Sequence, residues 1–163
     1  MDIVLNWFYF DGMIRLTKQS DYGIVLMTQF ARAGKGGFFS VTDLALRSGL
    51  SAPMVNKTVK LLLKAGLLVS SRGVNGGYQM ARDAGAITLE EIIEAVDGPI
   101  ALTECHEAGG VAACGILESC PTRINWGVIN QAVRDGLAGI TLLQMIHPFF
   151  STSGLRHPQR ELA

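Results

Sequence analysis

Apolar side chains recur at steps of three and four residues along much of this chain, and that spacing predicts a mainly α-helical protein. The first such segment is residues 21–33, and a glycine-rich stretch at 34–37 ends it. Its apolar stripe consists of Tyr22, Val25, Leu26 and Phe30. Such a stripe is typical of a helix that buries one face in a core.

Two short helices separated by a tight turn are predicted next. Ser40 begins a helix over residues 41–48, with Asp43 in capping-box position. Ser51 begins the following helix, which Gly66 ends. The outward face of this third helix carries Asn56, Lys57, Lys60 and Lys64. Two helices joined by a short turn, the second with a basic and amide-bearing face, are typical of a helix-turn-helix.

A β-hairpin is predicted directly after the third helix. Residues 67–71 and 77–80 are strand-like and flank an Asn75-Gly76 pair that favours a hairpin turn. A hairpin in this place is the wing of a winged helix, and Arg72 lies near its tip, where a DNA minor groove would lie. A phosphate-binding loop is the alternative, but the Gly-x-x-x-x-Gly-Lys-Ser/Thr pattern is absent from the sequence.

The last part of the chain contains two more predicted helices. Thr88 caps the first, with Glu91 three residues on, and the second runs from about 122 to 146. The stripe of the second helix consists of Trp126, Ile129, Val133, Leu137, Ile140 and Leu143. A helix of about 25 residues is roughly 37 Å long, which is more than a small core covers. We therefore expect it to pack against its counterpart in a homodimer; the alternative is that it folds back on its own domain.

The net charge of zero conceals two halves of opposite sign. Residues 13–83 contain ten Lys and Arg and three acidic residues, whereas residues 84–163 contain four Arg and nine acidic residues. A basic module joined to an acidic one is typical of a polyanion-binding domain with a separate sensing or assembly module, although chance scatter of surface charge is the alternative. Together with the winged helix, the split favours double-stranded DNA as the partner.

All three cysteines, Cys105, Cys114 and Cys120, lie within sixteen residues. An odd number in so tight a cluster argues against a secreted disulfide framework and for the reducing cytoplasm. Thiolates this close can share an iron–sulfur cluster (2Fe–2S or 4Fe–4S) or a zinc ion, although the paired Cys-x-x-Cys knuckles of zinc sites are missing. Structural thiols and a metal-free thiol redox switch are the alternatives. We do not expect an enzyme, because His106 adjoins Cys105 in sequence, where side chains rarely converge.

These elements divide the chain into five parts. We expect residues 1–12 to be a disordered extension or a mis-assigned start, because they lack the features of a signal peptide and are too short to span a membrane. No membrane association is expected. The remaining parts are a winged helix-turn-helix domain at 13–83, a linking helix and cysteine loop at 84–121, a dimerisation helix at 122–147 and a flexible tail at 148–163.

Four short motifs, taken in order, resemble a known family. They are Arg15-Leu16-Thr17-Lys18, Ser-Gly-Leu-Ser at 48–51, Arg-Gly-x-x-Gly-Gly-Tyr at 72–78 and Glu-x-Ile-x-x-Val-Asp-Gly at 91–98. With the cysteine loop they resemble the Rrf-type winged-helix regulators that carry iron–sulfur clusters, which include the IscR, NsrR and RirA branches. The opening from Thr17 to Gly23 is most similar to the branch that regulates the SUF operon for iron–sulfur cluster assembly.

The resemblance implies a repressor of SUF genes whose cluster state, held by the three cysteines, controls affinity for a palindromic operator. A nitric oxide- or iron-responsive repressor is the alternative within the family. For DNA readout we expect Asn56 and Lys57 to face base edges, and Lys60 and Lys64 to face phosphates. Arg72 would enter the minor groove from the wing. Ser51, at the start of the recognition helix, is the remaining residue that we expect to bind DNA.

The chain also departs from the family pattern at the expected fourth cluster ligand. The IscR branch has a histidine three residues after the last cysteine, where this chain has Arg123, which cannot lose its proton to ligate. The NsrR branch uses an aspartate from the other subunit, and the aligned residue here is Asp21; His106 and Glu107 are the other candidates. The aligned recognition-helix pair, Asn56-Lys57, differs from the Glu-Gln of IscR, so we expect a different operator.

Overall fold

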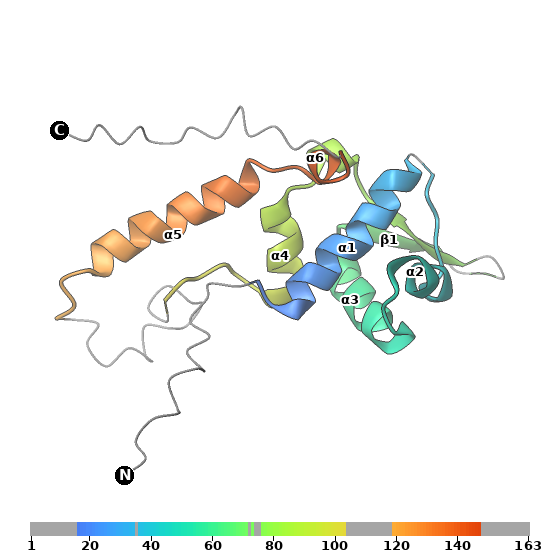
Figure 1. The fold of residues 1–163 in the computed structure, drawn as a ribbon, viewed down its shortest axis with the longest axis horizontal. Helices are drawn as coiled ribbons and strands as arrows, with labels where there is room; N and C mark the ends of the chain where they lie inside the picture. Colours follow the sequence, from blue (N-terminus) through green and yellow to red (C-terminus); the bar gives the residue numbers. More distant parts are fainter. Residues whose placement is uncertain (1–15, 35, 72, 74–75, 104–118, 148–163) are drawn as a thin grey trace, which may run out of the picture.

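The structure, a computed structural model, describes residues 16–34, 36–71, 73, 76–103 and 119–147. Its elements are α1 (Lys18–Ala33), α2 (Val41–Ser48), α3 (Ala52–Lys64), β1 (Leu68–Ser71), β2 (Gly77–Met80), the 3₁₀ turn η1 (Ala84–Ala86), α4 (Leu89–Asp97), α5 (Arg123–Ala138) and α6 (Leu142–Met145). Helices α1 to α4 gather at one end of the molecule with the hairpin beside them, and α5 projects away from them (Figure 1). The predicted fold class, mainly helical with a small β wing, is confirmed.

The helix starts follow local hydrogen-bond chemistry. The two predicted capping boxes are present, since the side chains of Ser40 and Thr88 accept from the backbone N–H of Asp43 and Glu91, and these carboxylates accept in return. Helix α1 begins earlier than predicted, because the hydroxyl of Thr17 accepts from the backbone N–H groups two and three residues on.

The core lies where α1, α3 and α4 meet. Its largest fully buried side chains include Phe30, Leu26 and Met27 of α1, Leu62 of α3 and Ile92 of α4. A close approach of α1 to α4 requires Gly23, because a Cβ atom there would lie 3.2 Å from Cγ1 of Val96. The winged domain therefore has a continuous core that fixes the outward face of α3.

The predicted wing is a two-stranded antiparallel hairpin. Leu68 pairs with Met80, and Ser71 pairs with Gly77, so the strands have matched lengths. A backbone bridge between Phe39 and Tyr78 attaches the hairpin to the segment before α2. Gly77 allows this contact, since a Cβ atom there would lie 2.7 Å from the carbonyl oxygen of Phe39. The wing root is thus anchored beside the helix-turn-helix.

The prediction of one helix from 122 to 146 is wrong in its last third. Helix α5 ends at Ala138, and Thr141 begins the separate short helix α6. The intervening backbone pairs with the start of α4, where the Leu89 N–H donates to the Ile140 carbonyl at 2.9 Å. Leu142 is fully buried, and Ile140 packs against the core. The break after α5 therefore allows both side chains to pack there.

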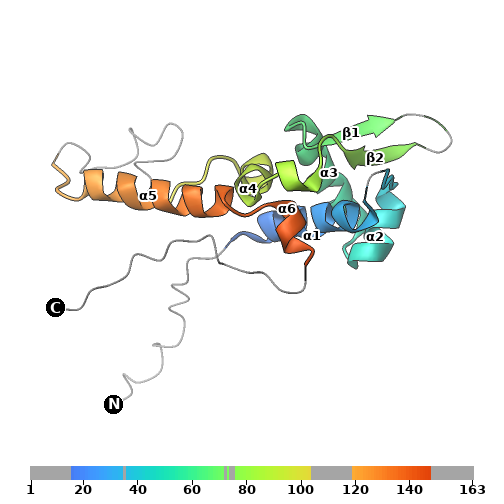
Figure 2. The ribbon, with the colours of Figure 1, turned by 90° about the horizontal axis from the view of Figure 1, so that it is seen from above.

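Helix α5 itself extends from the winged domain as an arm, as Figure 2 shows from a second direction. Its base is held by Arg134, whose guanidinium donates to Glu90 at 3.0 Å and lies 3.1 Å from Glu94 on α4. The buried amide of Asn130 accepts from the Leu102 N–H and donates to the Ile100 carbonyl. Within the part of the chain that the structure describes, no helix is long and apolar enough to cross a membrane.

Candidate DNA-binding surface and cysteine region

The basic face of α3 lies on the outside of the winged domain. Lys57, Lys60 and Lys64 are exposed and Asn56 is half-buried, whereas the opposite side of the helix packs into the core through Val55, Thr58, Val59 and Leu62. Ser51 occupies the N-cap position but makes no capping hydrogen bond with its side chain, and it is exposed. The predicted recognition residues of α3 therefore share one outward surface. Arg72 lies outside the described residues.

The turn between α2 and α3 has the geometry of a helix-turn-helix. Gly49 adopts φ +72°, a conformation that L side chains rarely adopt, and its N–H donates to the Ala45 carbonyl. Arg47, in the last turn of α2, is exposed and stacks 4.5 Å above the ring of Phe39. Arg47 was not among the predicted DNA-binding residues, although the sequence does place it in the last turn of α2.

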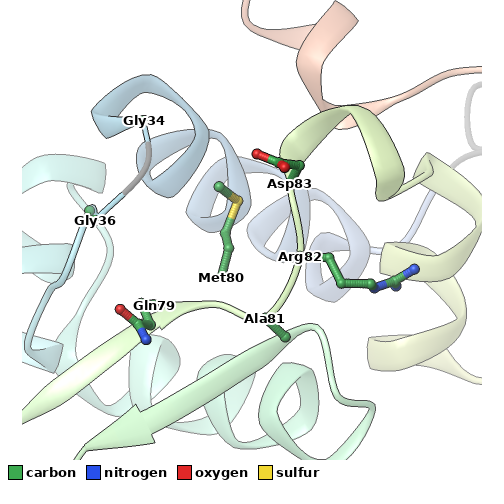
Figure 3. A pocket seen from close by; sticks show the side chains of 8 residues that line it. Gly34, Gly36, Gln79, Met80, Ala81, Arg82 and Asp83 are labelled. Carbon is green, nitrogen blue, oxygen red and sulfur yellow. The ribbon is translucent and has the colours of Figure 1, made fainter.

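A cavity of about 350 Å³ lies between the end of α1 and the end of β2. Figure 3 shows Arg82 directed away from Met80 and Gly34. Arg82 donates instead to Glu91 at 2.7 Å and to the Ala86 carbonyl at 3.1 Å, so its charge holds the start of α4. The cavity is lined by Gly34, Gly36, Gly37, Gln79, Met80, Ala81, Arg82 and Asp83. None of the predicted site residues is among them.

Cys120 is the cysteine that the structure describes, and its thiol lies just before α5. The hydroxyl oxygen of Thr122 lies 3.4 Å from Sγ of Cys120, and this hydrogen bond lowers the pKa of the thiol. Backbone hydrogen bonds from Thr122 and Arg123 and the positive charge of Arg123 lower it further. A lowered pKa favours the thiolate, which is the form that binds soft metals. The predicted ligands Cys105 and Cys114, and the candidates His106 and Glu107, lie outside the described residues.

Asp21 lies in the first turn of α1 and is exposed. Among the described residues its carboxylate makes no hydrogen bond or ion pair, so it is available as a ligand. Figures 1 and 2 both show the start of α1, the helix whose first turn contains Asp21, away from the start of α5, which Cys120 precedes. Residues 16–34, 36–71, 73, 76–103 and 119–147 contain no group of three or more His, Cys, Asp and Glu that could hold a metal ion.

Comparison with known proteins gives a consistent result. The family model Rrf2, described as an iron-dependent transcriptional regulator, matches residues 16–148. The transcriptional regulator IscR of Klebsiella pneumoniae is 31% identical over 146 residues, which cover 88% of each chain. IscR of Salmonella paratyphi B is also 31% identical, over 88% of this chain and 87% of its own.

Solved structures share the fold. CymR, the global cysteine regulator of B. subtilis, has a TM-score of 0.66 and 29% identity, over 82% of this chain and 97% of its own. IscR of T. potens has a TM-score of 0.63 and 27% identity, over 82% and 86%. The IscR relatives of Klebsiella and Salmonella are named as transcriptional regulators, which agrees with the exposed basic face of α3 and the adjacent wing. The chain is thus a DNA-binding transcriptional regulator rather than an enzyme, and it belongs to the Rrf2 family.

Proposed function

We propose that this regulator binds an iron–sulfur cluster and represses genes for iron–sulfur cluster assembly of the SUF type, with cluster loss changing its affinity for DNA. The observation that carries the proposal is the Cys120 thiol, which precedes the far end of the projecting helix α5 and has a lowered pKa, in a family described as iron-dependent. Cys105, Cys114 and Cys120 would hold the cluster, as 2Fe–2S or 4Fe–4S, with Asp21 as the fourth ligand. When bound, the cluster supplies an iron centre that responds to iron supply, oxidants or nitric oxide.

The basic face of α3 would occupy the major groove of an operator. Asn56 and Lys57 have the donors and acceptors that match adenine and guanine edges, respectively. Lys60 and Lys64, further along the same exposed face, would neutralise phosphates. Ser51 lies at the start of this helix with a free side chain, and Arg72 on the wing would reach the minor groove.

The active form would be a homodimer, acting in the cytoplasm, where its DNA lies. Helix α5 exposes apolar side chains that the winged domain does not cover, Ile124 and Val128 on one side and Trp126, Ile129 and Val133 on the other. A two-fold pairing of these helices would place two recognition helices on an imperfect palindrome with half-sites one or two helical turns apart. The fourth ligand, Asp21, would then come from the partner protomer.

A metal-free thiol switch is the second candidate function. The lowered pKa of Cys120 favours it, and a relative with 27% identity, CymR of Staphylococcus aureus, has a crystal structure in an oxidized form. Anaerobic purification followed by visible absorption, Mössbauer spectroscopy and assays of iron and acid-labile sulfide separates the two functions. We expect brown protein with iron and sulfide in equal amounts, and loss of both in Cys120→Ala. Colourless wild-type protein free of iron would refute the cluster and favour the thiol switch.

A further inference from the structure

Two side-chain hydrogen-bond links, joined through the first turn of α1, connect the end of α4 to the recognition helix. Its first link is Asp97, the last residue of α4, whose Oδ2 accepts from the hydroxyl of Thr17 at 2.5 Å and from the hydroxyl of Ser20. Thr17 is the N-cap of α1, and Ser20 is fully buried. The carboxylate of Asp97 therefore holds the N-terminus of α1, where the helix dipole also favours a negative charge.

The second link joins α1 to α3. The side-chain amide of Gln19, between Thr17 and Ser20, donates to the hydroxyl of Thr58 at 2.7 Å. Thr58 is fully buried in α3, and its hydroxyl donates in turn to the Met54 carbonyl at 2.9 Å. Thr58 directly follows Lys57, so a shift of this residue moves the basic face of the recognition helix.

The Gln19–Thr58 bond supplies directional control that the core does not. Helix α3 is buried through Val55, Val59 and Leu62, and apolar burial is not directional. A hydrogen bond, by contrast, holds donor and acceptor within a narrow range of distance and angle. A helix packed only on aliphatic side chains can rotate or slide by small amounts at little cost, but the Thr58 hydroxyl must stay in register with Gln19.

We propose that Gln19 and Thr58 are positioning residues for DNA recognition, and that Asp97 links them to the segment that leads into the cysteines. The proposal rests on the proposed function, in that it needs α3 to read DNA. Asp97 lies eight residues before Cys105. The intervening backbone at Ile100 and Leu102 is held by the buried amide of Asn130. A change in the segment after α4 thus has a short polar route to the recognition helix.

A double-mutant cycle tests the Gln19–Thr58 link. Gln19→Met and Thr58→Val keep side-chain size but remove the donor and the hydroxyl, respectively. The probes are the duplex that wild-type protein enriches from a random-sequence pool and a scrambled duplex of the same composition. We expect each single variant to lower the ratio of selected to scrambled affinity about tenfold, as for one buried hydrogen bond with an unpaired partner. The double variant should be no worse than the poorer single variant, because both partners are then apolar.

Matched controls separate positioning from general damage. Gln29→Met and Thr28→Val make the same chemical changes on α1, and Thr28 loses a similar bond to the Val25 carbonyl, so both should retain the wild-type ratio. Thr58→Ser keeps the hydroxyl and should retain it as well. For the first link, Asp97→Asn keeps an acceptor oxygen and should behave as wild type, whereas Asp97→Ala should lower the ratio. Thermal unfolding of each variant shows that the comparison is made on folded protein.

Additive losses in the double variant, or equal losses on selected and scrambled duplexes, would overturn the positioning role. A loss in Thr58→Ser as large as in Thr58→Val would also overturn it. Failure of wild-type protein to enrich any duplex would refute both this inference and DNA readout by α3. Equal affinity of cluster-loaded and cluster-free wild type would refute cluster control alone, leaving the Gln19–Thr58 link intact.

Discussion

Truncating Ile124 on α5 should weaken the proposed dimer. Ile124 is 83% exposed in the single chain, and Val128, one turn further along the same side of α5, is exposed as well. Ile124→Ala removes three carbon atoms from the arm without touching the winged core. An isologous interface contains this side chain twice, so each loss is doubled.

The magnitude follows from the area that dimerisation would bury. Three carbons at about 0.8 kcal/mol each give roughly 2.4 kcal/mol for complete burial. Scaling by the 83% that remains exposed in the single chain leaves about 2 kcal/mol per protomer, or roughly 4 kcal/mol per dimer. At about 1.4 kcal/mol per tenfold change, the dimer dissociation constant should rise by on the order of a thousandfold.

Sedimentation velocity over a concentration series measures this constant. The control is Leu46→Ala, which also removes three carbons and starts at 81% exposure, but lies on α2. It should leave the dissociation constant unchanged. An equal effect of the two substitutions, or none from Ile124→Ala, would refute pairing through the side of α5 that carries Ile124 and Val128. Ile140, part of the stripe predicted from the sequence, is unsuitable for the test because it packs on its own core.

Three further results are expected from the contacts of the winged domain. Lys60→Ala should weaken binding to all duplexes alike and reduce the slope of log affinity against log salt by about 1.8, roughly 0.9 for each protomer of the dimer, measured by anisotropy titration; an unchanged slope would mean that Lys60 contacts no phosphate. Gly77→Ala should lower the free energy of unfolding by on the order of 1–3 kcal/mol through the clash with Phe39, whereas Gly85→Ala, with 3.7 Å to its nearest neighbour, should be tolerated in urea unfolding; equal effects would contradict the close contact. Burial raises the pKa of Glu91, but its hydrogen bonds from Thr88 and Arg82 lower it more, so its contribution to stability is complete above the ordinary carboxyl pKa and lost as pH falls through the lowered value. The urea midpoint of Glu91→Gln should therefore be below that of wild type at neutral pH and converge with it in acid; a constant difference would contradict this.

Local chemistry explains which elements the sequence predicts correctly. The capping boxes at Ser40 and Thr88 depend on partners three residues apart, so both can be read directly. The break after Ala138 has a local signal as well, because Thr141 and Gln144 form a third capping box. The apolar period continues through that break, however, and it predicts one long helix. The capping box at Thr141 and the tertiary pairing of Ile140 with Leu89 together end it.

The candidate site likewise has one part that the sequence predicts and one part that only the folded chain reveals. The basic face of α3 is periodic, so its exposed positions follow from the sequence. The contact between Gln19 and Thr58 joins residues 39 positions apart and neither belongs to a chemical motif, so it appears only in the folded chain. The lowered pKa of Cys120 likewise depends on how Thr122 turns its hydroxyl at the start of α5. Ligation by Asp21 stays a prediction.

The most direct test of cluster control is the affinity of one selected duplex for anaerobic protein with and without its cluster, measured at a single salt concentration. The account predicts tighter binding by the cluster-loaded form, by roughly 5- to 150-fold, the range of a 1–3 kcal/mol coupling. Cys120→Ala should match the cluster-free form. Equal affinities of cluster-loaded, cluster-free and Cys120→Ala protein would contradict the claim that the cysteines control DNA binding.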